Sequence, residues 1–263
     1  MARRLSLLTG LLFFFVARPG WSQQQPAPAR MSFTVGAGYD QGDFGTTELS
    51  RAVYFPIAFR YTASRYEFGV SSSVARLSAP SGVRLIDGVP TVVGTGDALL
   101  RETGLGDTVL QARIFLHEDR GADTSAPALT PFFRLKLPTA SAERGLGTGE
   151  FDFGFGLEVD KDLGSAFVFG DIGYTVVGKV PRLGLRDRTV ASIGVGKRLS
   201  DAFSVSTLLD WRRSIIAGNP DPADLVGILS CRIGMTTVSP NAFLGLTDGS
   251  PDFGGGVQVR FRF

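Results

Sequence analysis

The sequence is poor in the side chains from which most metal and redox sites are built. Its 263 residues include a single Cys and a single His. One Cys excludes a disulfide framework and any zinc or iron–sulfur site built on several Cys ligands, and one His excludes a site that needs two imidazoles. We therefore expect no metal site, no cofactor and no catalytic residues. The 43% apolar content and the net charge of +2 exclude a disordered chain.

Long apolar runs are also missing, because no stretch reaches the 18 residues that would indicate a membrane-spanning helix. The longest run is Leu5 to Val16, which follows Arg3 and Arg4 and precedes the small residues Gly20 and Ser22. A basic start, a short apolar core and small residues before a cleavage point are typical of a secretory signal peptide. We expect signal cleavage after Ser22.

This cleavage point predicts three segments: a signal peptide (1–22), a short periplasmic lead-in (23–30) and a folded part (31–263). Removing the signal peptide removes three arginines and leaves 24 Lys and Arg against 25 Asp and Glu. The basic balance of the whole chain therefore says nothing about partners. The basic residues also form no run, so we expect no nucleic acid partner.

Glycine and phenylalanine are abundant, with 34 and 21 copies. Glycine is among the poorest helix formers, which argues against a helical fold. The apolar residues recur with a period of two, most clearly at the chain end. There Val257, Val259, Phe261 and Phe263 alternate with Gln258, Arg260 and Arg262. Such a segment forms a strand with one apolar and one polar face.

Alternating segments recur along the chain, and we count twelve. They are 31–39, 51–62, 64–76, 105–117, 128–137, 150–160, 166–177, 188–199, 203–214, 224–235, 241–247 and 253–263. Short and long connectors alternate between them, and an even number returns both ends to one side, as in bacterial outer-membrane barrels. We expect an all-β, antiparallel, up-and-down transmembrane β-barrel of about 12 strands. A secreted β-sandwich would show a similar alternation.

The last strand resembles the closing strand of bacterial outer-membrane barrels, which ends in an aromatic residue. The resemblance implies that Phe261 and Phe263 form an assembly signal that the barrel assembly machinery reads. It also implies that outer-membrane lipid covers the apolar face and that the protein resides in the bacterial outer membrane.

Three motifs stand in the middle third of the chain: GLGD at 104–107, KLPT at 136–139 and GLGTG at 145–149. Their order resembles the MetA-pathway of phenol degradation family, whose members are outer-membrane proteins labelled as transporters. The resemblance implies a barrel that passes small, aromatic molecules, and it supplies no catalytic residues. The residues after Thr139 depart from the Gly-Asp-like turn of that family. The GLGTG motif lacks the preceding strand and following helix of a phosphate-binding loop.

Strand alternation also predicts which charged side chains face the lumen. They are Arg60, Arg65, Glu67, Arg113, Arg134, Lys136, Asp152, Glu158, Asp171, Arg198, Asp210, Arg212, Arg232, Arg260 and Arg262. They could line a polar channel that prefers anions or polarisable aromatic molecules. Alternatively they pair across neighbouring strands, as Arg134 and Lys136 could with Asp152. The apolar stretch 89–93 makes 77–104 a candidate for an inward-folded loop.

These observations predict a channel for the passive uptake or efflux of small molecules. Two alternatives remain at this point. The first is a structural or adhesive barrel that transports nothing. The second is an outer-membrane hydrolase, for which His117 would be the one available histidine, beside Glu118 and Asp119. We expect turn residues rather than an active site there, and hence no enzyme.

Overall fold

The computed structural model describes residues 6–8, 13–15, 30–44, 48–86, 88–96, 98–117 and 126–263. Two short strands, β1 (Ser6–Leu8) and β2 (Phe13–Phe15), pair with each other within the expected signal peptide. The expected cleavage point and the lead-in lie outside the described residues, so the three segments stay a prediction. No helix among the described residues is long and apolar enough to cross a membrane.

The remaining strands are long and antiparallel, and all but two of them belong to one sheet. They are β3 (Arg30–Gly42), β4 (Ser50–Thr62), β5 (Tyr66–Pro80), β6 (Val83–Ile86), β7 (Val89–Val92), β8 (Leu99–Leu105), β9 (Thr108–Ile114), β10 (Ala128–Leu137), β11 (Asp152–Leu163), β12 (Ala166–Val176), β13 (Arg188–Arg198), β14 (Phe203–Arg212), β15 (Ala223–Ile233), β16 (Thr236–Gly245) and β17 (Phe253–Arg262). Strands β6 and β7 form a separate hairpin.

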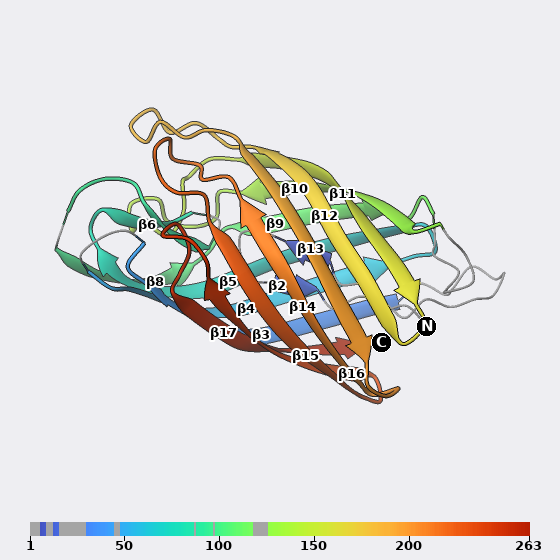
Figure 1. The fold of residues 1–263 in the computed structure, drawn as a ribbon. Coiled ribbons are helices and arrows are strands. Elements are labelled where there is room, and N and C mark those ends of the chain that lie inside the picture. The colour runs from blue at the N-terminus through green and yellow to red at the C-terminus, as the bar shows by residue number, and fades with distance from the viewer. Residues whose placement is uncertain are drawn as a thin grey trace.

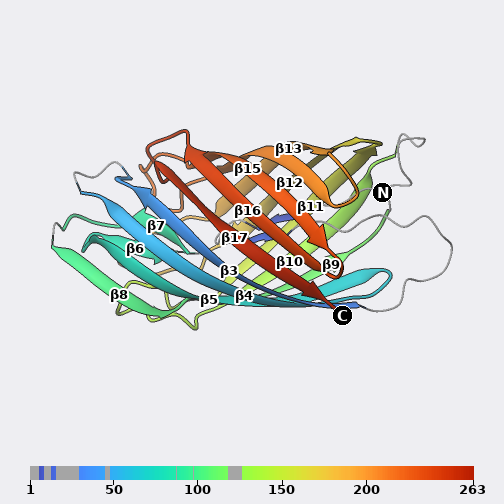
Figure 2. The ribbon, with the colours of Figure 1, turned by 90° about the horizontal axis from the view of Figure 1, so that it is seen from below.

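The large sheet closes on itself into a barrel (Figures 1 and 2). Each strand pairs with the next, β17 pairs with β3, and β4 pairs with β5. Strands β8 and β9 occupy one position, because both pair with β5 and only Gly106 and Asp107 separate them. The thirteen strands of this sheet therefore make a twelve-stranded barrel, as predicted.

The two ends of the barrel differ in their connections. At the end that we call the turn end, the connections are 63–65, 115–127, 164–165, 199–202 and 234–235, and β3 begins and β17 finishes there. At the opposite end, the loop end, they are 43–49, 81–98, 138–151, 177–187, 213–222 and 246–252. Short turns at one end and long loops at the other are typical of outer-membrane barrels.

Two strands begin well before their predicted bounds. The strand predicted from residue 105 begins at Leu99, where β8 pairs with the end of β5. The strand predicted from residue 241 begins at Thr236 and runs through Pro240. Pro240 pairs with Val257 of β17, whereas the pairing with β15 is interrupted beside it. Because proline lacks an N–H donor, it can pair on one side only, so it does not end the strand.

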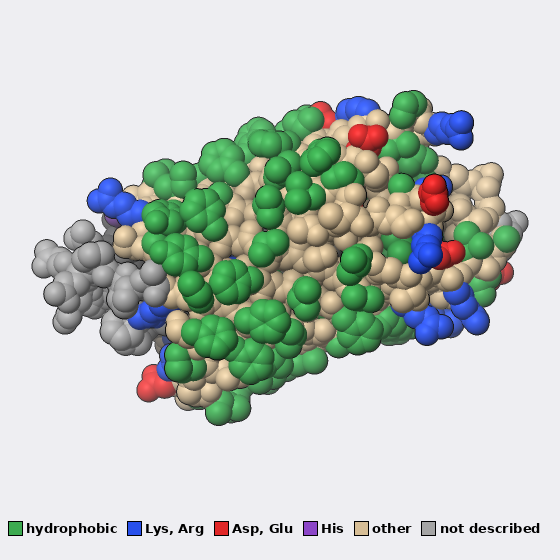
Figure 3. All heavy atoms as spheres, turned by 180° about the vertical axis from the view of Figure 1, so that it is seen from behind, with side chains coloured by type: hydrophobic (Ala, Val, Ile, Leu, Met, Phe, Trp, Pro, Cys, Tyr) green, Lys and Arg blue, Asp and Glu red, His purple; other side chains and the backbone are tan. Residues whose placement is uncertain are grey.

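The outer wall is apolar and the inner wall is polar, as the alternation predicted. In β4, Phe55 and Ile57 are about half exposed, at 53% and 50%. Ala58 and Arg60, which point inward, are buried, at 4% and 6%. Figure 3 shows the apolar side chains spread over the barrel wall on one face, with charged side chains gathered at its ends. In a barrel that crosses a bilayer, such a wall contacts lipid.

Several inward glycines accommodate aromatic rings of the neighbouring strand. A Cβ atom on Gly194 or Gly196 of β13 would collide with the ring of Phe169 or Phe167, which are their partners on β12. Phe132 of β10 covers Gly156 of β11 in the same way. These glycines lie on the inner wall. Glycine is needed at each of these positions, because the ring occupies the space that a side chain would fill.

Candidate functional site

The lumen is the candidate site, and the structure places nearly all predicted lumen residues on its wall. Those that face inward are Arg60, Glu67, Arg113, Arg134, Lys136, Asp152, Glu158, Asp171, Arg198, Asp210, Arg212, Arg232, Arg260 and Arg262, all buried or half-buried. Arg65 departs from the prediction. The strand begins at Tyr66, so Arg65 belongs to the turn 63–65 and is exposed. Whether the inward residues line a conducting path remains a prediction.

One network of charges crosses four strands in the half of the barrel near the turn end. The guanidinium of Arg113 on β9 lies 2.6 Å from Glu67 Oε1 on β5 and 3.0 Å from Glu158 Oε1 on β11. Arg60 on β4 lies 3.3 Å from the same Glu67 oxygen, and the Thr62 hydroxyl donates to the other. Buried ions of this kind depend on one another, because removing one leaves its partners uncompensated.

A second network joins the three sequence motifs near the loop end. Lys136 of KLPT lies 3.3 Å from Asp107 Oδ2 of GLGD and donates to the Thr148 hydroxyl of GLGTG at 2.9 Å. Its third partner is Asp152 Oδ2, at 2.8 Å, across the β10–β11 pair. We call Asp107, Lys136, Thr148 and Asp152 the motif node. The predicted approach of Lys136 to Asp152 is present in the structure.

Backbone contacts complete the motif node. Asp107 Oδ1 accepts a hydrogen bond from Ala140 N at 3.0 Å, and the Thr139 hydroxyl donates to Gly106 O at 3.0 Å. Gly145 and Gly149 have φ angles of +70° and +77°, which glycine adopts without strain. The glycines of GLGTG therefore shape a turn that carries Thr148 to Lys136. The motif shapes the loop 138–151.

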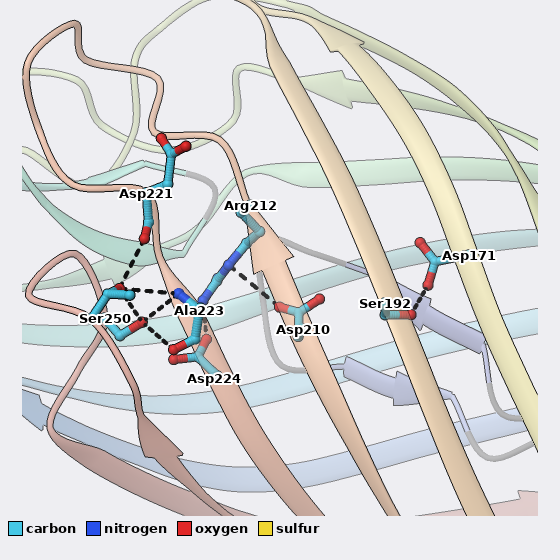
Figure 4. A network of polar contacts seen from close by, with 9 residues as sticks. Asp171, Ser192, Asp210, Arg212, Asp221, Ala223, Asp224 and Ser250 are labelled. Atoms are coloured by element: carbon cyan, nitrogen blue, oxygen red, sulfur yellow. Dashed lines mark hydrogen bonds and ion pairs between the residues drawn. The ribbon is translucent and has the colours of Figure 1, made fainter.

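A third group of polar side chains lies on β12 to β15 (Figure 4). Arg212 pairs with Asp224, and its Nε lies 3.4 Å from Asp210 Oδ2. Farther from the loop end, the Ser192 hydroxyl donates to Asp171. Each of these four carboxylate or guanidinium groups thus has a partner on its own strand or a neighbouring one.

The hairpin of β6 and β7 lies inside the loop end. Its Val83, Leu85 and Ile86 are almost completely buried, at 4%, 1% and 1% exposed. Val83 and Leu85 pack in one apolar cluster with inward side chains of β4 and β5, including Tyr54 and Leu77. Ile86 packs in another cluster, formed with Val177, Leu185 and Ile215 of the loops. The predicted inward-folded segment within 77–104 is thus this hairpin.

Three hydrogen bonds fix the hairpin to two loops of the mouth, 138–151 and 213–222. Leu85 N donates to Gly145 O at 2.7 Å, and Arg84 Nη1 donates to Ala142 O at 2.7 Å. From the loop 213–222, Asn219 Nδ2 donates to Val92 O at 2.9 Å. The hairpin is therefore held on one side by the loop that the motif node positions.

Comparison with known proteins finds a similar fold in outer-membrane proteins of known structure. No family model matches the chain. No curated protein matches it either. Among solved structures, an outer-membrane channel from Pseudomonas putida F1 has a TM-score of 0.64, covers 94% of this chain and all of its own, and is 13% identical. The NanC porin has a TM-score of 0.54, with 87% and 98% covered and 8% identity. The fold is that of an outer-membrane barrel.

Sequence reasoning missed several members of these networks. Asp107 and Thr148 belong to the GLGD and GLGTG motifs, but the motifs alone indicate no role for them. Asp224 is on the same face of β15 as Arg232, eight residues later, so the strand pattern could have identified it as inward. By contrast, nothing in the sequence joins Asp40 to Tyr54, whose hydroxyl donates to Asp40 Oδ2 at 2.7 Å. Among the described residues, no three His, Cys, Asp or Glu side chains come together as a metal site.

The remaining predicted residues lie at the turn end. His117 is exposed and forms an isolated bridge with Leu129, while Glu118 and Asp119 lie outside the described residues. At the chain end, Phe261 and Phe263 are on the outer wall, the latter 69% exposed, and Phe263 N donates to Met31 O. This position leaves both rings accessible from outside the barrel.

Proposed function

We propose that this chain is an outer-membrane channel through which small molecules pass without an energy source. The observation that carries the proposal is the closed barrel with an apolar outer wall, a polar inner wall and an apolar hairpin across one mouth. An apolar belt can meet lipid, and the inward charges provide a polar interior. The hairpin is the part that would regulate passage at the loop end.

Two further points support this proposal. The fold is shared with an outer-membrane channel from Pseudomonas putida F1 and with the NanC porin. The order of GLGD, KLPT and GLGTG resembles the MetA-pathway of phenol degradation family, from which we infer aromatic or hydrophobic solutes. The motif node gives these motifs a shared structural role, because they meet at one lysine.

We also propose that the loop end faces outward, that the turn end faces the periplasm and that the chain is delivered by a cleaved signal peptide. Phe261 and Phe263 would present the terminal aromatic signal to the assembly machinery. Neither ring is covered by another strand of the described barrel, which is what recognition from outside requires. Replacing Phe263 with Ala should lower the amount of folded barrel in the outer membrane, and an unchanged amount would contradict this role.

The channel proposal is tested by incorporating the purified chain into planar bilayers. We expect discrete conductance steps, and uptake of small solutes by proteoliposomes. A folded, inserted barrel that passes neither ions nor solutes would favour the structural or adhesive alternative. The hydrolase alternative is tested separately with lipid and peptide substrates, and hydrolysis lost in His117→Ala would support it. The exposed turn-end position of His117 gives that enzyme no enclosed site.

A further inference from the structure

Three exposed arginines lie on the outer wall of the barrel at the loop end. Arg51 is near the start of β4, Arg76 is near the end of β5, and Arg101 is near the start of β8. These strand ends are neighbours (Figure 2), because β4 pairs with β5 and β5 pairs with β8. All three side chains are exposed. We call Arg51, Arg76 and Arg101 the arginine patch.

The strand register places the arginine patch on one face of the wall. Arg51 is the partner of Ser78, and Ser78 is the partner of Arg101. Arg76 is two residues before Ser78 and therefore lies on the same face of β5. Because neighbouring strands are about 4.8 Å apart, the backbones at Arg51 and Arg101 are about 10 Å apart, and Arg76 lies between them.

The polarity of this part of the outer wall changes row by row toward the middle of the barrel. The row nearest the loop end is polar and consists of the register partners Gln41, Arg51, Ser78 and Arg101. The next row is mixed and consists of Tyr39, Val53, Arg76 and Thr103. The third row is apolar and exposed, and consists of Phe55, Val74 and Leu105. This order matches that of a lipid leaflet, with polar headgroups above apolar chains.

The arginine patch is surrounded by neutral side chains. None of the three rows contains a carboxylate. Arg51 Nε donates to the neutral Gln41 Oε1 at 3.1 Å, and neither Arg76 nor Arg101 forms an ion pair within the described part of the chain. Like charges within about 10 Å of one another repel, and an anion bound between them relieves that repulsion.

Two further side chains border the arginine patch. Arg144 Nη1, from the loop 138–151, donates to Thr103 O at 3.4 Å and brings a fourth exposed arginine to its edge. The Tyr39 hydroxyl donates to Gln41 Oε1 at 2.7 Å. Tyrosine is typical of the boundary between headgroups and acyl chains in membrane barrels. The arginine patch therefore lies at the level of lipid headgroups.

We propose that the arginine patch binds the phosphate groups of a lipid in the leaflet at the loop end. Guanidinium groups bind phosphate oxygens through paired, charge-assisted hydrogen bonds. Because the three arginines span about 10 Å, the headgroup that fits carries at least two phosphates. The acyl chains of this lipid lie along Phe55, Val74 and Leu105. The adjoining apolar row is the reason for choosing a lipid over a soluble anion, and the binding does not depend on the passage of solutes.

The test measures lipid binding to the purified full chain in detergent by native mass spectrometry. The probes are diphosphoryl lipid A and monophosphoryl lipid A, which differ by one phosphate group. We expect the diphosphoryl form to bind several-fold more tightly. Replacing Arg51, Arg76 and Arg101 together with Gln should weaken its binding about a hundredfold, because each basic residue at an anionic lipid surface contributes about fivefold.

The matched control removes the same charge from elsewhere on the surface. It replaces Arg65, Arg182 and Arg213 with Gln, and these arginines are exposed outside the arginine patch. Binding of diphosphoryl lipid A should be unchanged in this control. If the patch variant fails to fold, as judged by heat-modifiable migration, Arg76→Gln alone tests the same site and should weaken binding about fivefold.

Equal lipid binding by the patch variant and the control would overturn this inference. Displacement of diphosphoryl lipid A by an equal concentration of pyrophosphate would also overturn it, because the patch would then be a site for a soluble anion. A folded barrel that binds diphosphoryl lipid A through the arginine patch but passes no solute would contradict the proposed channel and support this inference.

Discussion

Lys136 Nζ lies 2.8 Å from Asp152 Oδ2, and the two residues are direct partners across the β10–β11 pair. The same ammonium reaches Asp107 and Thr148. One lysine therefore connects the barrel wall with two segments, the junction of β8 and β9 at Asp107 and the loop 138–151. Since the second of those segments also binds the hairpin through Gly145 O, the wall and the mouth are structurally linked.

Replacing Lys136 with Met should strongly destabilise the barrel. The change leaves Asp107 and Asp152 buried without their cation, which costs about 3–5 kcal/mol. We expect a clearly lower unfolding temperature in detergent, followed by heat-modifiable migration on gels. The matched control is Lys179→Met, because Lys179 is exposed and its pair with the half-buried Asp187 is worth about 0–1 kcal/mol. Equal losses in both variants would contradict the role of the motif node.

The fit between rings and glycines predicts that two glycine-to-alanine substitutions differ in their effect on stability. Gly196→Ala introduces a methyl group against the buried ring of Phe167 and should lower the free energy of unfolding by about 1–3 kcal/mol. Gly227→Ala is the control, since the nearest atom to its added Cβ is 4.0 Å away, on the exposed face of β15. The double variant with Phe167→Leu should lose less than the sum of its parts. Strict additivity would show that the ring and the methyl group do not compete.

The barrel could be predicted because its pattern is local. Alternation with a period of two is set by the strand itself, so the segment ending at Phe263 and the segment containing Phe55 identify their outer faces without tertiary information. Arg65 was misplaced because a turn residue continues the alternation that a strand begins. The strand predicted from residue 241 begins earlier, at Thr236. Pro240 does not interrupt it, because one side of Pro240 remains paired.

The networks of the site depend on which strands become neighbours. Arg113 and Glu158 are separated by β10, and their contact depends on the tilt and curvature of the wall. Tyr54 and Asp40 are diagonal neighbours across the β3–β4 pair, since the register partner of Tyr54 is Gly38. Asp107 shows the limit of prediction from sequence. The GLGD motif contains Asp107, but its partner Lys136 is 29 residues away along the chain.

Removing the hairpin should enlarge the flow of solutes. Residues 82–96 can be replaced by an Asn-Gly turn without strain, because Ser81 N already donates to Ala98 O at 2.9 Å. We expect faster uptake of small sugars by proteoliposomes. Asn219→Leu, which removes the bond to Val92 O, should raise uptake more modestly. If flux is unchanged in a folded deletion variant, the hairpin does not restrict the path.

The loop 177–187 contains a pair whose pH dependence has a defined sign. Lys179 donates to Asp187 and lowers the pKa of that carboxyl below its ordinary value of 3.8, with help from Val177 N. The stabilisation is present above that ordinary value and is lost as the pH falls through the lowered pKa. Asp187→Asn should therefore loosen the loop at pH 7, measured as faster tryptic cleavage after Lys179. Asp248→Asn in the loop 246–252 is the control, and equal rates in the two variants would contradict the pair's role.

Single-channel recording in planar bilayers tests the central claim most directly, with the purified chain and its 82–96 replacement side by side. We expect discrete steps from both proteins and a larger conductance from the replacement. If both folded proteins insert and neither conducts, the barrel is not a channel and the account is contradicted.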